Sequence, residues 1–270
     1  MKRREFLQRT GAVVAGGTAA WSASGGDLSA ATDADNDRQR VLVTGVENEL
    51  ARRIAAALAD AWTVRTTSTE RVDTDLPFTL CSLESDAEIQ PLLQGVTAIV
   101  HAGCAASADQ ERAQTGQATR RTYHLLQGAV AAGVRRVVFL SSLDLLDNVD
   151  SQYLVDEDFR PQAMTGTGQL VRQLEEVCCR EFARSRRLQV VVLRLAALIH
   201  QDALAPMENG SPAVTASDAI GAVRLALETE QISDGRGIET WSVFHILSNP
   251  DQTRFPIHRA KRLLGYAPQS

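Results

Sequence analysis

The chain has 270 residues, of which 44% are hydrophobic and 23% charged, enough to bury the core of one large α/β domain. The formal net charge is −5 and the arginines are scattered along the sequence, which argues against a nucleic-acid-binding surface. Lys2 and Lys261 are the only lysines, so no glycine-rich turn is followed by the lysine that a P-loop needs.

The N-terminus is organised like an export signal. Residues 1–9 are rich in arginine, residues 10–21 are mostly small and apolar, and Arg3-Arg4 resembles the pair of the twin-arginine signal. We therefore expect a signal peptide over residues 1–30, a polar linker over 31–39, and a periplasmic or otherwise extracytoplasmic mature protein. The alternative is an N-terminal helix with a charged end. The apolar stretch is shorter than the about 20 residues of a membrane span, so we expect no stable span after signal removal.

From Arg40 to the end, apolar runs of strand length alternate with stretches of helix length. The runs are continuous and rich in β-branched residues, which is typical of strands buried on both faces. The pattern predicts one α/β domain over residues 40–270, with a doubly wound parallel sheet. The expected strands are 41–44, 62–67, 98–102, 136–142 and 188–198.

The cysteines give no sign of a metal site. Cys81, Cys104, Cys178 and Cys179 form no CxxC pair and have no matching histidine spacing. We expect no bound metal, and we interpret Cys178 and Cys179 as packing residues on a helix.

Several segments in order resemble the extended short-chain dehydrogenase/reductase family, in its NAD-dependent epimerase/dehydratase group. They are 41–45 (VLVTG), 92–103 (LLQGVTAIVHAG), 131–142 (AAGVRRVVFLSS), 155–161 (VDEDFRP), 190–194 (VVVLR), 214–228 and 260–268. The C-terminal part looks most like the compact branch that includes uronate dehydrogenases. The resemblance implies a Rossmann-like, NAD(P)-binding fold, a reduced C-terminal substrate lobe, and oxidoreductase chemistry on a sugar or sugar acid.

In that family the first turn carries glycines that bind the cofactor pyrophosphate. Here Gly45 keeps the first role, Ala51 is an acceptable small residue in the third, and Asn48 stands in the second. Asn48 is expected to cap the following helix, and Glu47 and Glu49 place negative charge at its positive end. This arrangement weakens the prediction of a phosphate site.

The adenosine end departs from the family pattern in the same way. Ser68 replaces the aspartate that would hold the ribose hydroxyls of NAD, and Ser82 replaces the aspartate beside adenine. Ser68 and Arg71 are equally compatible with the 2′-phosphate of NADP and with an ordinary loop. The cofactor is thus NAD, NADP or none.

The loop beside the cofactor follows the family better, because His101, Ala102 and Gly103 match its pattern. A histidine at the end of a strand is, however, more often a packing residue.

Catalysis in the family uses serine, tyrosine and lysine, with the tyrosine four residues before the lysine on one helix face. Ser142 matches the serine, but Gly168 stands at the tyrosine position and Arg172 at the lysine position. No tyrosine in the chain is followed by lysine four residues later. A guanidinium is not a substitute for a compact ammonium, and there is no phenol for it to activate.

Two hypotheses remain open. In the first, the chain is an exported NAD(P)-dependent oxidoreductase or epimerase with altered catalytic groups; in the second, it is a non-catalytic binding or regulatory protein of the same fold. Both predict a small-molecule ligand such as a sugar or uronate and no nucleic acid, and both leave oligomerisation open.

Replacing Arg3 and Arg4 by lysine tests the predicted export. Because the paired arginines are the defining feature of the signal that the N-terminus resembles, we expect the double variant to remain in the cytoplasm as uncleaved precursor. Fractionation followed by immunoblotting measures this. Export of the double variant at the normal level would remove the prediction.

Overall fold

A computed structural model describes residues 39–103, 111–162, 166–200, 211–232, 237–250 and 253–269, with the backbone alone at 111–114. The predicted signal peptide, nearly all of the predicted linker and Cys104 lie outside these residues.

Within the described residues, seven strands form one sheet in the order β3-β2-β1-β4-β5-β6-β9, and every neighbouring pair is parallel. The strands are β1 (Arg40–Thr44), β2 (Thr63–Ser68), β3 (Phe78–Leu80), β4 (Ala98–His101), β5 (Arg136–Ser142), β6 (Gln189–Leu195) and β9 (Trp241–Ile246). Two further strands, β7 (Ala197–Ile199) and β8 (Ala213–Thr215), pair in a small separate sheet. The expected doubly wound parallel sheet is confirmed.

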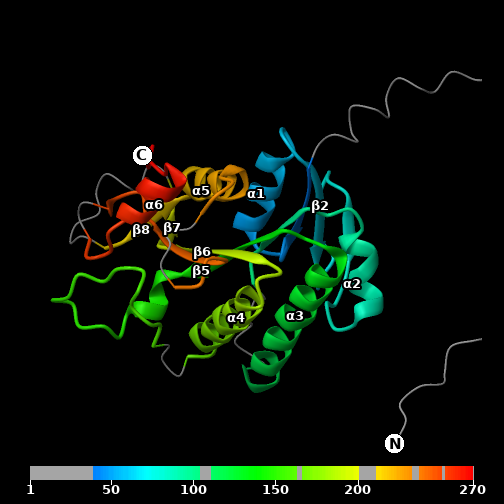
Figure 1. Ribbon diagram of the computed structural model, residues 1–270, viewed down its shortest axis with the longest axis horizontal. Coiled ribbons are helices and arrows are strands. Elements are labelled where there is room, and N and C mark those ends of the chain that lie inside the picture. The colour runs from blue at the N-terminus through cyan, green and yellow to red at the C-terminus, as the bar shows by residue number, and fades with distance from the viewer. Residues whose placement is uncertain are drawn as a thin grey trace, which may run out of the picture. The chain divides into compact units, whose positions relative to one another are not determined.

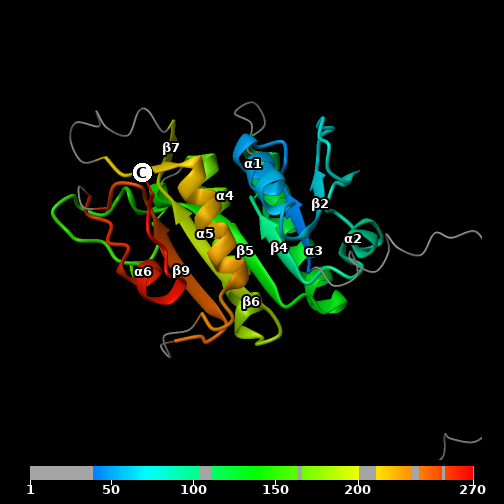
Figure 2. The ribbon, with the colours of Figure 1, turned by 90° about the horizontal axis from the view of Figure 1, so that it is seen from above.

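Helices cover both faces of the sheet (Figures 1 and 2). Helices α1 (Glu49–Leu58), α5 (Ala216–Glu228) and α6 (His258–Leu264) contribute to one core. Helices α2 (Asp86–Leu93), α3 (Glu111–Ala132) and α4 (Thr167–Arg184) lie on the opposite face. A short 3₁₀ helix, η2 (Leu143–Leu146), follows β5.

Strand β5 shows why the strands read as continuous apolar runs. Val138 and Leu140 pack into the core with α1 and α5, whereas Val137 and Phe139 pack into the core under α3 and α4. Because successive side chains point to opposite faces, a strand covered on both sides needs an apolar residue at every position.

The expected strand over 188–198 is two strands. β6 ends at Leu195 and β7 begins at Ala197, where the chain leaves the main sheet. Both halves are apolar, so the break at Ala196 has no signature in the hydrophobic pattern. Gly133, with φ of 74°, follows the end of α3, because the left-handed conformation that closes a helix suits glycine.

A buried ion pair fixes α4 to β6. Arg194 donates from Nε to Oε1 of Glu176 at 3.0 Å and from Nη2 to Oε2 at 3.0 Å. Ser141 of β5 also donates to Oε1 at 2.6 Å. The side chains of Arg194 and Glu176 are only 3% and 5% exposed. The carboxylate is therefore hydrogen-bonded to two strands at once.

Replacing Glu176 by alanine should destabilise the fold by about 3–5 kcal/mol, because it leaves the Arg194 guanidinium buried without its carboxylate. Glu181 lies on the same helix with a side chain that is 49% exposed, so Glu181→Ala is the matched control and should change stability by about 0.5 kcal/mol or less. Urea unfolding of both variants measures the difference. Equal midpoints for the two variants would show that the pair does not fix α4.

Candidate functional site at the carboxyl edge of the sheet

The turn between β1 and α1 is closed against the loop that follows β4. Gly45 has φ of 73°, and a Cβ at this position would lie 2.9 Å from the carbonyl oxygen of Gly103. The Gly45 N–H donates to the carbonyl of Thr67 at 2.9 Å. Gly45 is thus required by the turn itself, and the buried Ala51 packs into the core behind it.

Asn48 caps α1, as expected. Its Oδ1 accepts hydrogen bonds from the N–H of Leu50 at 2.8 Å and of Ala51 at 3.4 Å. Arg52 donates to the carbonyl oxygens of Val46 and Glu47 and holds the turn from the other side. Two of the N–H groups that a phosphate would use at the start of the helix are therefore already bonded.

Glu47 adds a carboxyl group to the same turn. Burial raises the pKa of Glu47, with a smaller contribution from Glu70. Its Oε2 is buried and has no hydrogen-bond partner among the described residues. A second anion in this turn would be repelled by the ionised carboxylate, or would require Glu47 to be protonated.

The polar side chains expected at the adenosine end also have internal partners. Ser68 is buried and donates to the carbonyl oxygen of Glu70. Ser82 donates to Oε2 of Glu88 at 2.5 Å. Arg71 is exposed. The structure therefore does not bring Ser68 and Arg71 together around a shared anion.

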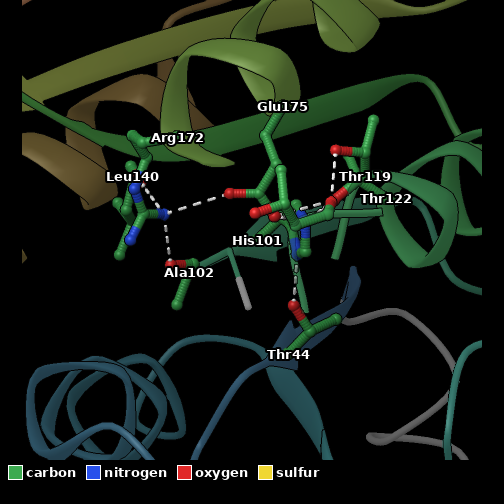
Figure 3. Close-up of polar contacts among 9 residues, drawn as sticks. Thr44, His101, Ala102, Thr119, Thr122, Leu140, Arg172 and Glu175 are labelled. Carbon is green, nitrogen blue, oxygen red and sulfur yellow. Dashed lines mark hydrogen bonds and ion pairs between the residues drawn. The ribbon is translucent and has the colours of Figure 1, made fainter. Parts of the chain in front are cut away.

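His101 is the centre of a buried polar network (Figure 3). Its Nδ1 lies 2.6 Å from Oγ1 of Thr44, and its Nε2 lies 3.0 Å from Oγ1 of Thr122. Thr122 donates to Oε1 of Glu175 at 2.9 Å. Burial lowers the pKa of His101 to about 3, with a smaller contribution from Arg172, so the imidazole is neutral at pH 7. Through these hydrogen bonds His101 links β1, β4, α3 and α4.

Arg172 extends this network to the carboxyl ends of β4 and β5. Its Nη1 donates to the carbonyl oxygens of Ala102 at 2.8 Å and Leu140 at 2.9 Å, and lies 3.7 Å from Oε2 of Glu175. Gly103 has φ of 76°, and a Cβ there would lie 1.9 Å from Nη1 of Arg172. The arginine at the lysine position thus anchors the ends of two strands.

The remaining catalytic positions do not form a proton-transfer arrangement. Ser142 accepts a hydrogen bond from the N–H of Asp144 at 3.3 Å and caps η2. Gly168 is exposed in the first turns of α4, and a Cβ there would meet no atom of the described residues within 4 Å. Ser142 therefore has a local capping role, and the tyrosine position is open space.

Sequence reasoning did not identify Thr44, Thr122 and Glu175, which complete the network. Glu175 is fully buried. A signal for it was present, because Glu175 lies four residues from both Val171 and Cys179, which are buried on the same helix face. A glutamate within an apolar stripe needs a buried partner.

The described residues do not fit a dinucleotide in this conformation. Asn48 caps the N–H groups of Leu50 and Ala51, Glu47 lies in the turn, and Ser68 and Ser82 are bonded within the chain. Within the part of the chain that the structure describes, no three His, Cys, Asp or Glu residues are grouped to hold a metal. No helix there combines the length and apolarity needed to cross a bilayer.

The sequence model of the NAD dependent epimerase/dehydratase family matches residues 41–234. No curated protein matches at a significant level.

Solved structures share the fold. A short-chain dehydrogenase/reductase superfamily protein from Agrobacterium tumefaciens with bound NAD is 20% identical, with a TM-score of 0.70 over 86% of this chain and 93% of that one. Uronate dehydrogenase from the same organism is 20% identical, with a TM-score of 0.70 over 86% and 85%. UDP-glucose 4-epimerase from Thermotoga maritima, solved with UDP-glucose, is 17% identical, with a TM-score of 0.66 over 86% and 94%.

The structure of the turn at residues 45–51 leads to a prediction about the affinity for a dinucleotide. We expect the unaltered protein to bind free NAD(H) or NADP(H) poorly, and Asn48→Gly combined with Glu47→Ala to bind more tightly, because the variant frees the helix N–H groups and removes the carboxyl. Glycine at the N-cap costs only a few tenths of a kcal/mol, so about the same helix stability should remain. Calorimetric titration measures the affinities.

Glu49→Ala is the matched control, since Glu49 is exposed at the start of the same helix. It should raise the affinity less than the double variant does. Tight dinucleotide binding by the unaltered protein would contradict the interpretation of the turn as self-capped.

Proposed function

Because the chain belongs to the NAD dependent epimerase/dehydratase family, we propose that it is a ligand-binding member that has lost the tyrosine-dependent hydride transfer of its relatives. The strongest support comes from the residue that stands at the position of the family's lysine. There, Arg172 is engaged with the backbone carbonyls of Ala102 and Leu140, and the tyrosine position four residues earlier is Gly168.

Hydride transfer to or from a sugar carbon also requires a proton to leave or reach the adjacent oxygen. In the family that the sequence resembles, a tyrosine phenol transfers this proton, and a lysine lowers the pKa of the phenol. Gly168 has no side chain, and an arginine guanidinium is not a group that gives up a proton in such a step. Ser142 alone does not provide the missing function, because a hydroxyl without a neighbouring base does not move a proton efficiently.

The proposed ligand is a small sugar or sugar acid. Two observations favour this class: the family match, and the likeness of the fold to proteins whose names include a uronate dehydrogenase and a UDP-glucose 4-epimerase. The carboxyl edge of the sheet is the usual ligand position in open parallel α/β sheets, and Ser142, Gly168 and Arg172 all lie near it.

A second candidate is an active NAD(P)-dependent oxidoreductase with a rebuilt proton-transfer group. The family match favours it. In this alternative the dinucleotide binds after the turn at residues 45–51 rearranges, and a residue other than tyrosine acts as acid and base.

We further propose that the protein acts outside the cytoplasm. The Arg3-Arg4 motif and the apolar stretch after it support this location.

Turnover assays test the proposed loss of chemistry. General acid/base catalysis by a placed side chain contributes about 10²–10⁴ in rate, so we expect no detectable reduction of NAD or NADP with glucuronate or galacturonate. Ser142→Ala should leave this result unchanged. Absorbance at the reduced nicotinamide band measures turnover, and mass spectrometry after acid release shows whether the purified protein carries a nucleotide.

Turnover by the unaltered protein would support the second candidate. If Ser142→Ala or Arg172→Ala then abolished it while thermal unfolding stayed cooperative, the oxidoreductase hypothesis would replace the binding hypothesis.

A further inference from the structure

The guanidinium of Arg172 is held on one side and open on the other. Nη1 makes the polar contacts, to Ala102, Leu140 and Glu175, and the guanidinium carbon lies 5.7 Å from the centre of the Phe139 ring. In Figure 3 the dashed lines from Arg172 start at this one nitrogen. Nε and Nη2 have no hydrogen-bond partner among the described residues, and the side chain is 24% exposed. The group is therefore fixed in place while two donor nitrogens remain free.

Arg194 shows how the Nε and Nη2 edge of an arginine binds a carboxylate elsewhere in this protein. Its Nε and Nη2 donate to the two carboxylate oxygens of Glu176, each at 3.0 Å. This paired arrangement matches the geometry of a carboxylate or phosphate. The same edge of Arg172 has no such partner among the described residues.

Position 168 of α4 has no side chain and is exposed. Gly168 lies four residues before Arg172, so the two positions share one face of the helix. Apart from its chain neighbours and the nearby helix backbone, a Cβ at Gly168 would meet no atom of the described residues within 4 Å. The helix face that carries Arg172 is therefore open at this position.

The charges around Arg172 favour an anion on the open side. Glu175 is fully buried and approaches Nη1 at 3.7 Å, so it lies on the anchored side. His101 is neutral, because burial lowers its pKa to about 3. Because the ion pair with Glu175 is made at Nη1, Nε and Nη2 form no ion pair with a carboxylate of the described residues.

We propose that the Nε and Nη2 edge of Arg172 binds an oxyanion group of the ligand, a carboxylate or a phosphate, at the carboxyl edge of the sheet. This inference rests on the proposed binding function and names the chemical group that the site selects. Arg172 is then a specificity-determining residue, and Gly168 provides the space for the anion.

Calorimetric titration of the full-length mature protein tests the proposal with two pairs of probes. Glucuronate is compared with glucose for the carboxylate, and ADP with adenosine for the phosphate. We expect at least one anion to bind about tenfold or more tightly than its uncharged partner, since hydrogen bonds to charged groups have that strength. The pair that shows the difference identifies the source of the oxyanion.

Arg172→Lys separates the two roles of the side chain. A lysine ammonium can still donate to the Ala102 and Leu140 carbonyls but cannot form the paired contact. We expect this variant to lose the preference for the anion. Arg180→Lys, at an exposed position on the same helix, is the matched control and should keep it.

Gly168→Leu provides an independent test that leaves the anchor of Arg172 intact. It should block anion binding by filling the space, and it decides the question if Arg172→Lys does not fold. The proposal is overturned if neither anion binds more tightly than its uncharged partner, or if the preference survives in the folded variants. Reduction of NAD or NADP is measured separately in the same samples. Such turnover would contradict the proposed function and not the proposal about Arg172.

Discussion

The site depends on two adjacent glutamates of α4, Glu175 and Glu176, whose side chains are buried. Glu175 accepts from Thr122 and lies near Arg172, while Glu176 binds Ser141 and Arg194. Two carboxyl groups buried side by side would be strongly destabilising without partners, so each must be satisfied by a different group of neighbours. This requirement sets how α4 lies on β5 and β6. It thereby also places Gly168, Arg172 and the carboxyl ends of β4 and β5 relative to one another.

The same principle explains why the expected cofactor positions have internal partners. In a site built for a dinucleotide, some donors and acceptors await the ligand; here Asn48, Ser68, Ser82 and His101 bond to groups of the protein. Breaking such a bond for a ligand exchanges one hydrogen bond for another and gains little net free energy. The open edge of Arg172 differs, because its contact with a ligand would cost no internal bond.

Sequence reasoning predicted the parallel sheet, the strand over 136–142 and the cap by Asn48, because apolar runs and capping residues leave local signatures. It missed the short strands β3 and β8, whose three residues each are too few to show a pattern, and it also missed β9 and the break between β6 and β7. The buried polar network of Thr44, His101, Thr122 and Glu175 joins residues far apart in the chain. Only the folded topology brings these residues together, so their partners could not be derived from local spacing.

The contact between Gly103 and Arg172 links two positions that are distant in sequence. Any side chain at position 103 would occupy the volume taken by Nη1 of Arg172, and φ of 76° adds a conformational penalty. The two positions should therefore show epistasis: a substitution at 103 becomes less harmful once residue 172 has been shortened.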